Sequence, residues 1–162
     1  MKNVIALLFS FVAFSAVAQS NPTEIPPTVV EVDSIFTKED VYKSLKVYIA
    51  ESFKNANAAI QMDDLDLGVI IVKGTYENYM KGIFGERNPA GFWHFTAKFE
   101  VKDGRYRYSV YDIYLEQAQA TTYPDKIYRW DDYRANRLRE MIAELQATFG
   151  SIHVEATESE DW

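Results

Sequence analysis

The acidic residues of this sequence include one whose position suggests chemistry. Counting by twos along its segment places Asp112 on the same face as the apolar residues Tyr108 and Tyr114. A carboxylate on an apolar face is costly unless it is paired. Asp112 could therefore act as a proton-donating acid in a pocket, or as a structural carboxylate bonded to a tyrosine, a backbone N–H or an arginine. No second acid or base stands beside it, so the structural role is favoured.

The remaining candidate groups form no recognisable site. His94 and His153 lie on separate segments without the spacing of metal ligands. The acidic cluster 63–66 lacks the spaced ligands and the closing glutamate of an EF-hand loop, so a solvated turn is expected there. The chain has no cysteine, no Gly-x-Ser-x-Gly and no glycine-rich phosphate loop. The sequence therefore predicts no catalytic residue, no metal site and no cofactor.

Residues 1–18 have the three-part pattern of a cleavable signal peptide. A short start containing Lys2 precedes an apolar stretch from Val4 to Val17. The small residues Ala16-Val17-Ala18 then provide a cleavage site before Gln19. A membrane-spanning helix needs about 20 apolar residues, and this stretch is shorter. We therefore expect an exported protein, periplasmic or extracellular, without a membrane span after cleavage.

The charge of the chain narrows the choice of partner. It has 17 basic and 24 acidic residues and a net charge of -7, and removal of Lys2 with residues 1–18 would make this about -8. Nucleic-acid binding relies on Lys and Arg that neutralise phosphates, so the acid excess argues against nucleic acid and anionic lipid. Because an exported chain without cysteine has no disulfide, a hydrophobic core must hold the fold together.

The next segments predict a linker, a strand and a helix. Residues 19–27 are polar and contain three prolines, which favours an extended linker. The β-branched segment Thr28–Asp33 predicts a first strand. Thr37 and Asp40 have the spacing of a capping box, with Asp in place of the usual Glu. They predict the start of a helix over residues 38–54, in which apolar residues recur every four positions.

The middle of the chain predicts two strands and a loop. Residues 59–62 and 69–76 have the composition of strands, and a turn separates them. Residues 77–91 contain three glycines and one proline, which predicts a long loop. Its charged residues form no recognisable constellation, so a mobile loop is favoured over a functional one.

A hairpin is the clearest local signal. Apolar and polar residues alternate from Trp93 to Lys102, as in a half-buried strand, and Asp103-Gly104 suits a two-residue type I′ turn. Such a turn fixes which residues lie opposite each other on the two strands. The predicted cross-strand pairs are Lys102 with Arg105, Glu100 with Arg107, Phe99 with Tyr108 and Phe95 with Asp112.

A second helix is predicted from about residue 132, with an apolar stripe on one side and charged residues, including Arg137, largely on the other. The stripe consists of Leu138, Met141, Ile142, Leu145, Phe149 and Ile152. Residues 155–162 carry four acids and little to bury, which predicts an acidic tail without a fixed structure.

The predicted order is β-α-β-β-β-β-α, which indicates an α+β fold with two helices on one face of a mostly antiparallel sheet. The segments Tyr42–Ile49, Gly68–Thr75 and Gly104–Ile113 resemble an exported bacterial domain of unknown function with a TATA-binding-protein-like (TBP-like) fold. The resemblance implies a single domain over residues 28–154 and no catalytic residues. The DNA binding of the fold's namesake uses a basic sheet surface, which the acid excess argues against.

The sheet face away from the helices is the candidate site. The alternation places apolar and aromatic residues there, whereas a solvated sheet face is mostly polar. This candidate partner-binding face consists of Phe92, His94, Thr96, Tyr111, Ile113 and Leu115, with Val69 and Ile71 from the neighbouring strand. It is either a binding surface or a face covered by the linker, by the loop 77–91 or by the region around Tyr123.

Two functions remain open from the sequence. The favoured one is a non-catalytic binding or interaction domain that uses the open sheet face to bind an envelope or extracellular protein, a peptide or a glycan. The alternative is a cell-envelope hydrolase that uses Asp112, or another carboxylate paired with His94. An enzyme requires a concave pocket with convergent titratable groups, whereas a binding module requires a flat or shallow apolar face.

Overall fold

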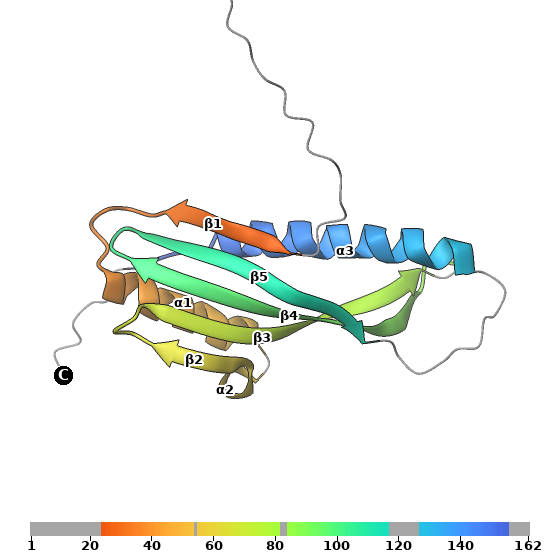
Figure 1. Cartoon of the computed structure of the whole chain (residues 1–162), viewed down its shortest axis with the longest axis horizontal. Coiled ribbons are helices and arrows are strands. Elements are labelled where there is room, and N and C mark those ends of the chain that lie inside the picture. Colours follow the sequence, from red (N-terminus) through yellow and green to blue (C-terminus); the bar gives the residue numbers. More distant parts are fainter. Residues whose placement is uncertain (1–23, 54, 82–83, 117–126, 156–162) are drawn as a thin grey trace, which may run out of the picture.

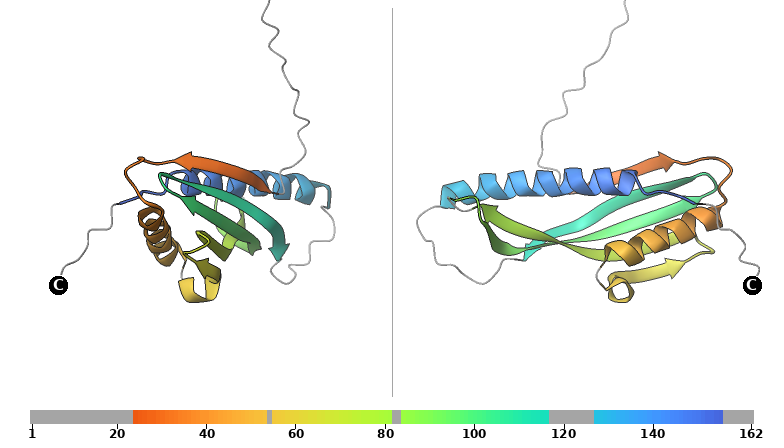
Figure 2. Two further views of the ribbon diagram at one scale, coloured as in Figure 1. Left: turned by 60° about the vertical axis from the view of Figure 1, so that its left-hand side comes forward. Right: turned by 180° about the vertical axis from the view of Figure 1, so that it is seen from behind.

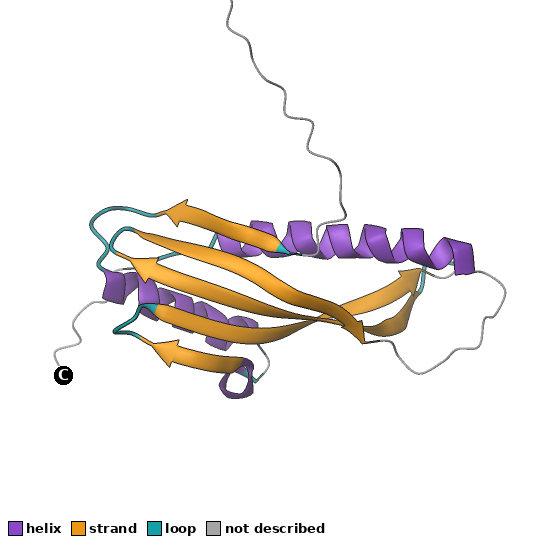
Figure 3. Ribbon diagram, in the orientation of Figure 1, coloured by secondary structure: helices purple, strands orange, loops and turns teal. Residues whose placement is uncertain are grey.

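The computed structural model describes residues 24–53, 55–81, 84–116 and 127–155. The predicted signal peptide, the region around Tyr123 and the acidic tail beyond residue 155 lie outside these ranges. Five antiparallel strands form one sheet in the order β1-β5-β4-β3-β2 (Figures 1 and 3). In chain order the elements are β1 (Ile25–Glu31), α1 (Lys38–Ser52), α2 (Ala56–Ala59), β2 (Ile60–Asp64), β3 (Val69–Lys81), β4 (Arg87–Lys102), β5 (Arg105–Glu116) and α3 (Ile127–Gly150).

Helices α1 and α3 both lie on one face of the sheet. Figure 1 looks onto the other face, and the view from behind shows the two helices in front of the strands (Figure 2, right). The core lies between these two layers, where the apolar stripes of the helices meet the inward side chains of β3, β4 and β5. The predicted α+β arrangement is confirmed, with the one-turn helix α2 as an addition.

Local sequence signals explain α1. Thr37 caps the helix, because its hydroxyl accepts from the Asp40 N–H at 3.3 Å while its own N–H donates to Asp40 Oδ2 at 2.9 Å. The predicted capping box is therefore confirmed. Lys46 Nζ lies 2.6 Å from Asp63 Oδ2, and the Tyr42 hydroxyl donates to the other carboxylate oxygen. Asp63 thus fastens the edge strand β2 to α1, rather than lying in the solvated turn that was expected.

Strand β1 begins at Ile25, three residues before the predicted start. The Ile25 side chain is buried against the core and pairs with Val110 of β5. The register shifts between Ile25 and Thr28, so Pro26 and Pro27 lie in an irregularity of this edge strand. Proline is tolerated there because an edge strand leaves some of its N–H groups unpaired. Pro26 and Pro27, which the sequence predicted to lie in a linker, therefore belong to β1.

The predicted loop over residues 77–91 is mostly sheet. Strand β3 continues to Lys81 and β4 starts at Arg87, so the two strands pair along this segment. The register shifts after Asn78, and Gly91 opposite it has a φ of 110°. Glycine takes this conformation readily, so the ladder continues past the irregularity. The prediction of a loop was wrong for most of this segment, because Gly91 lies within β4 rather than ending it.

The hairpin of β4 and β5 follows the predicted register near its turn. Lys102 pairs with Arg105, and Glu100 pairs with Arg107. The turn is not type I′, because only Gly104 has a positive φ, of 64°. Asp103 instead directs its carboxylate to α1, where Oδ1 accepts from the Lys38 N–H at 2.7 Å. The turn therefore differs from the predicted type I′ turn, and its Asp103 carboxylate contacts the start of α1.

Candidate functional site

A β-bulge at Asp112 determines which side chains of β5 reach the outer face. Tyr111 pairs with Thr96 and Tyr114 pairs with His94, so both Asp112 and Ile113 lie opposite Phe95. Asp112 has a φ of 54°, in the left-handed region that aspartate tolerates better than most residues. The extra residue reverses the alternation for the rest of the strand.

The bulge corrects the predictions for the last residues of β5. Ile113 and Leu115 pack against the core instead of facing outward, and Leu115 pairs with the buried Trp93. Asp112 is exposed, so its carboxylate does not lie on an apolar face and needs no buried partner. Tyr114 takes the outward position, where 58% of its surface is exposed. Phe95 does not pair with Asp112 alone, as predicted, but lies opposite both Asp112 and Ile113.

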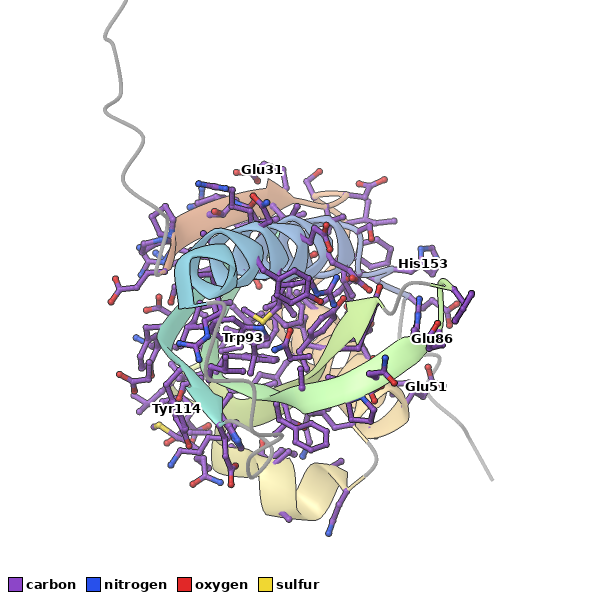
Figure 4. The ribbon with its side chains drawn as sticks, turned by 90° about the vertical axis from the view of Figure 1, so that its right-hand side faces the viewer. Glu31, Glu51, Glu86, Trp93, Tyr114 and His153 are labelled. Atoms are coloured by element: carbon purple, nitrogen blue, oxygen red, sulfur yellow. The ribbon has the colours of Figure 1, made fainter. Side chains whose placement is uncertain are left out.

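The outer face has an aromatic end formed by Phe92, His94 and Tyr114, which we call the aromatic patch. The rings of His94 and Tyr114 stack with their centroids 4.7 Å apart and their planes 7° apart. Phe92 lies two residues before His94 on β4, and 51% of its surface is exposed. Figure 4, which views the molecule from this end, shows Tyr114 at the edge of the sheet away from α3. The sequence analysis placed Phe92 and His94 correctly and missed Tyr114.

The other end of the outer face is more polar. Val69 and Ile71 of β3 are half-buried there, as are Glu100 and Lys98 beside them on β4. Arg107 donates to Glu100 Oε2 from Nε at 2.8 Å and from Nη2 at 2.6 Å. Burial works against ionisation of Glu100, but the hydrogen bonds and charges of Arg107 and Lys98 hold its pKa below the ordinary value. Ion pairs thus lie directly beside these two apolar residues, which makes this end of the face more polar than the aromatic patch.

Glu116 orients the histidine of the aromatic patch. Its Oε2 lies 2.7 Å from His94 Nε2, while Tyr114 stacks on the ring. This is the carboxylate–histidine pair that the hydrolase alternative requires. The described residues contain no group of three His, Asp or Glu side chains that could hold a metal ion.

An open depression of about 500 Å³ adjoins the aromatic patch. Gly74 lines part of it, and the ring of Phe95 occupies the place that a side chain at position 74 would take. Thr96 lies in the depression and is only 6% exposed. The residues that line it are Lys73, Gly74, Thr75, His94, Phe95, Thr96, Asp112, Ile113 and Tyr114. The depression therefore combines hydroxyl groups, charges and aromatic rings.

This arrangement of one antiparallel sheet with α1 and α3 on one face, and neither of them on the other, defines an α+β domain of the TBP-like class. The chain belongs to the family described as Domain of unknown function (DUF4468) with TBP-like fold, which matches residues 27–116. The resemblance inferred from the sequence is thereby confirmed. The family description assigns no activity, so function has to be argued from the site.

A solved structure supports this fold. A DUF4468 family protein from Bacteroides ovatus ATCC 8483 matches with 12% identity and a TM-score of 0.54, over 77% of this chain and 85% of that chain. A TBP-like protein from Parabacteroides distasonis ATCC 8503 matches with 9% identity and a TM-score of 0.48, over 78% of this chain and 92% of that chain. A comparison with curated proteins gave no match.

Proposed function

We propose that this protein is an exported, non-catalytic binding domain that holds its ligand on the aromatic patch. The carrying observation is that Phe92 and Tyr114 are each more than half exposed on a face that α1 and α3 leave uncovered. Aromatic rings offer large apolar area at a small cost in conformational entropy, and they are enriched in binding sites for that reason. The stack with His94 and the contact of Glu116 pre-orient the patch.

The depression beside the patch favours a glycan as the ligand. A sugar ring has an apolar C–H face that can stack on Tyr114 or Phe92, and hydroxyl groups that need polar partners. Thr75, Lys73 and Asp112 offer such partners around the depression. A partner protein or a peptide would use the same rings, but the mixed lining fits a ligand that is itself both apolar and hydroxylated.

The His94–Glu116 pair supports a second candidate, a cell-envelope hydrolase. A histidine oriented by a carboxylate can act as a general base. The pair lies beside an open depression rather than in a closed pocket, and Asp112 is exposed at the bulge. Binding is therefore the function that the geometry supports better, and Glu116→Gln distinguishes the two.

Glycan binding is expected to depend on the two exposed rings. Tyr114→Ala and Phe92→Ala should each weaken binding by about tenfold or more, as removal of a central contact residue does. The measurement is the affinity of the full chain for a panel of soluble oligosaccharides by calorimetry. Phe84→Ala is the matched control, because Phe84 is 91% exposed and lies outside the patch.

Three outcomes contradict the proposal in different ways. If Tyr114→Ala bound the oligosaccharide as tightly as the parent, the aromatic patch would not be the binding site. Capture of a peptide or protein by the patch without any glycan binding would overturn the choice of ligand. Hydrolysis of an oligosaccharide that Glu116→Gln abolishes would identify the protein as an enzyme.

Export is tested separately. Cleavage after Ala16-Val17-Ala18 is expected to leave Gln19, or its cyclised form, as the first residue of the protein isolated from its host. Mass spectrometry of that protein gives the N-terminus directly, and a chain that retains Met1 would contradict export by this route. Among the described residues, no helix is long and apolar enough to cross a membrane.

A further inference from the structure

Arg137 of α3 is buried on the inner side of the sheet, far from the polar stripe to which the sequence assigned it. Only 6% of its surface is exposed. Its guanidinium carbon lies 4.1 Å from the ring centroid of Tyr79, on the extended part of β3, and Nη1 pairs with Glu140. Nε and Nη2 are buried and have no hydrogen-bond partner within the described part of the chain.

These two nitrogens form one side of the guanidinium group. The hydrogens of Nε and Nη2 project in parallel from that edge, at the spacing of the two oxygens of a carboxylate or phosphate. A buried charged group without its partners is costly, so native proteins rarely leave such an edge empty. The free edge of Arg137 is therefore a specific signal for a bound acceptor.

Two further buried side chains, Asn78 and Trp93, each have a polar atom without a hydrogen-bond partner among the described residues. Asn78 is fully buried and its Oδ1 has no donor, although Nδ2 lies 3.4 Å from the Ala90 carbonyl. The indole Nε1 of Trp93 is also without an acceptor among the described residues. Figure 4 shows Trp93 between α3 and the sheet.

The strand register relates Trp93 and Asn78 to the part of β3 that Arg137 contacts through Tyr79. Trp93 pairs with Tyr76, which precedes Asn78 by two positions on β3. Burial raises the pKa of the Tyr76 hydroxyl and Glu144 adds to this effect, while the positive charge of Arg137 opposes it. Arg137, Trp93 and Asn78 thus surround the same stretch of β3.

We propose that this interior cluster binds a small organic carboxylate, whose two oxygens accept hydrogen bonds from Arg137 Nε and Nη2. Trp93 Nε1 is a third donor, and Asn78 Oδ1 accepts from a hydroxyl or amino group next to the carboxylate. The ligand class is therefore a small hydroxy or amino acid. A single negative charge is favoured over phosphate, because Glu140 already pairs with the guanidinium and Glu144 accepts from the Tyr76 hydroxyl. The site is separate from the aromatic patch and does not depend on its function.

The test follows the tryptophan indole N–H signals of the full chain by NMR. The chain has three tryptophans, and Trp93→Phe identifies the signal of Trp93. We expect a saturable shift of this signal with sodium lactate, a weaker response to acetate, and no saturable shift with chloride or inorganic phosphate. A cluster that holds only water predicts no shift with any carboxylate, and that result would overturn the proposal.

Two variants examine the role of the Arg137 edge. Arg137→Lys keeps the charge but loses the two parallel donors, so lactate should bind about tenfold more weakly or worse. Arg107→Lys is the matched control, because Glu100 on the outer face already holds that guanidinium. Unchanged lactate affinity in folded Arg137→Lys would show that the edge is not the binding group.

A second variant keeps the proposal falsifiable if Arg137→Lys does not fold. The side chain of Glu140 is 62% exposed, so Glu140→Gln should fold normally. It removes the negative charge that competes for the guanidinium, and lactate should then bind about threefold more tightly. Weaker or unchanged binding in this variant would contradict a carboxylate held by Arg137.

Discussion

Replacing Phe149 by alanine is expected to lower the free energy of unfolding by about 3–5 kcal/mol, as truncation of a buried phenylalanine does. The Phe149 side chain is 1% exposed and lies where α3 meets both α1 and the sheet. Four aromatic rings surround it, three of them edge-on, and such contacts add to the effect of burial. Their centroids lie 6.3 Å (Tyr48), 6.5 Å (Phe95), 5.2 Å (Phe99) and 5.7 Å (Tyr108) from that of Phe149.

Urea unfolding followed by circular dichroism measures this effect, with Phe84→Ala as a control for loss of an exposed ring. The control should stay within about 0.5 kcal/mol of the parent. Phe149→Leu keeps most of the volume and should retain much of the stability. A loss below about 1 kcal/mol for Phe149→Ala would mean that α3 does not pack on the sheet through this residue. The expected loss is a large share of the total, because domains of this size are stable by about 5–15 kcal/mol.

Sequence patterns predicted the parts of this fold that depend on neighbours in the chain. The capping box at Thr37 and the apolar stripe around Phe149 each lie within one helix. The pair of Glu100 with Arg107 lies near a turn, where the register has little length over which to drift. The family resemblance then supplied the TBP-like fold, which no local pattern fixes.

The errors arose where long-range contacts decide the conformation. Arg137 has the pattern of a solvated helical residue, and its burial results from the extension of β3 to Tyr79. That extension was hidden by the glycines of residues 77–91, which favour a loop when considered alone. The interior cluster of Arg137, Trp93 and Asn78 therefore could not be predicted without knowing how α3 packs on the paired ends of β3 and β4.

The bulge at Asp112 did leave a trace in the sequence. Before it the buried residues of β5 occupy even positions, such as Tyr108 and Val110, and after it the core-facing residues occupy odd ones, Ile113 and Leu115. Such a change of parity within one strand is the signal of an inserted residue. Continuing the even count through Asp112 reversed the assignment of the two faces and concealed the role of Tyr114.

Ile113→Asp is therefore expected to lower the free energy of unfolding by about 2–4 kcal/mol, because it places a carboxylate against the core and removes apolar packing. Tyr114→Asp, at the next residue, introduces the same charge on the outer face and should cost less than about 1 kcal/mol. Thermal and urea unfolding of the two variants compares adjacent positions of one strand, so differences in local propensity are small. If the bulge is present, the melting temperature of Ile113→Asp should be well below that of Tyr114→Asp. The opposite order would mean that the alternation runs unbroken through Asp112, and Ile113 rather than Tyr114 would then belong to the outer face.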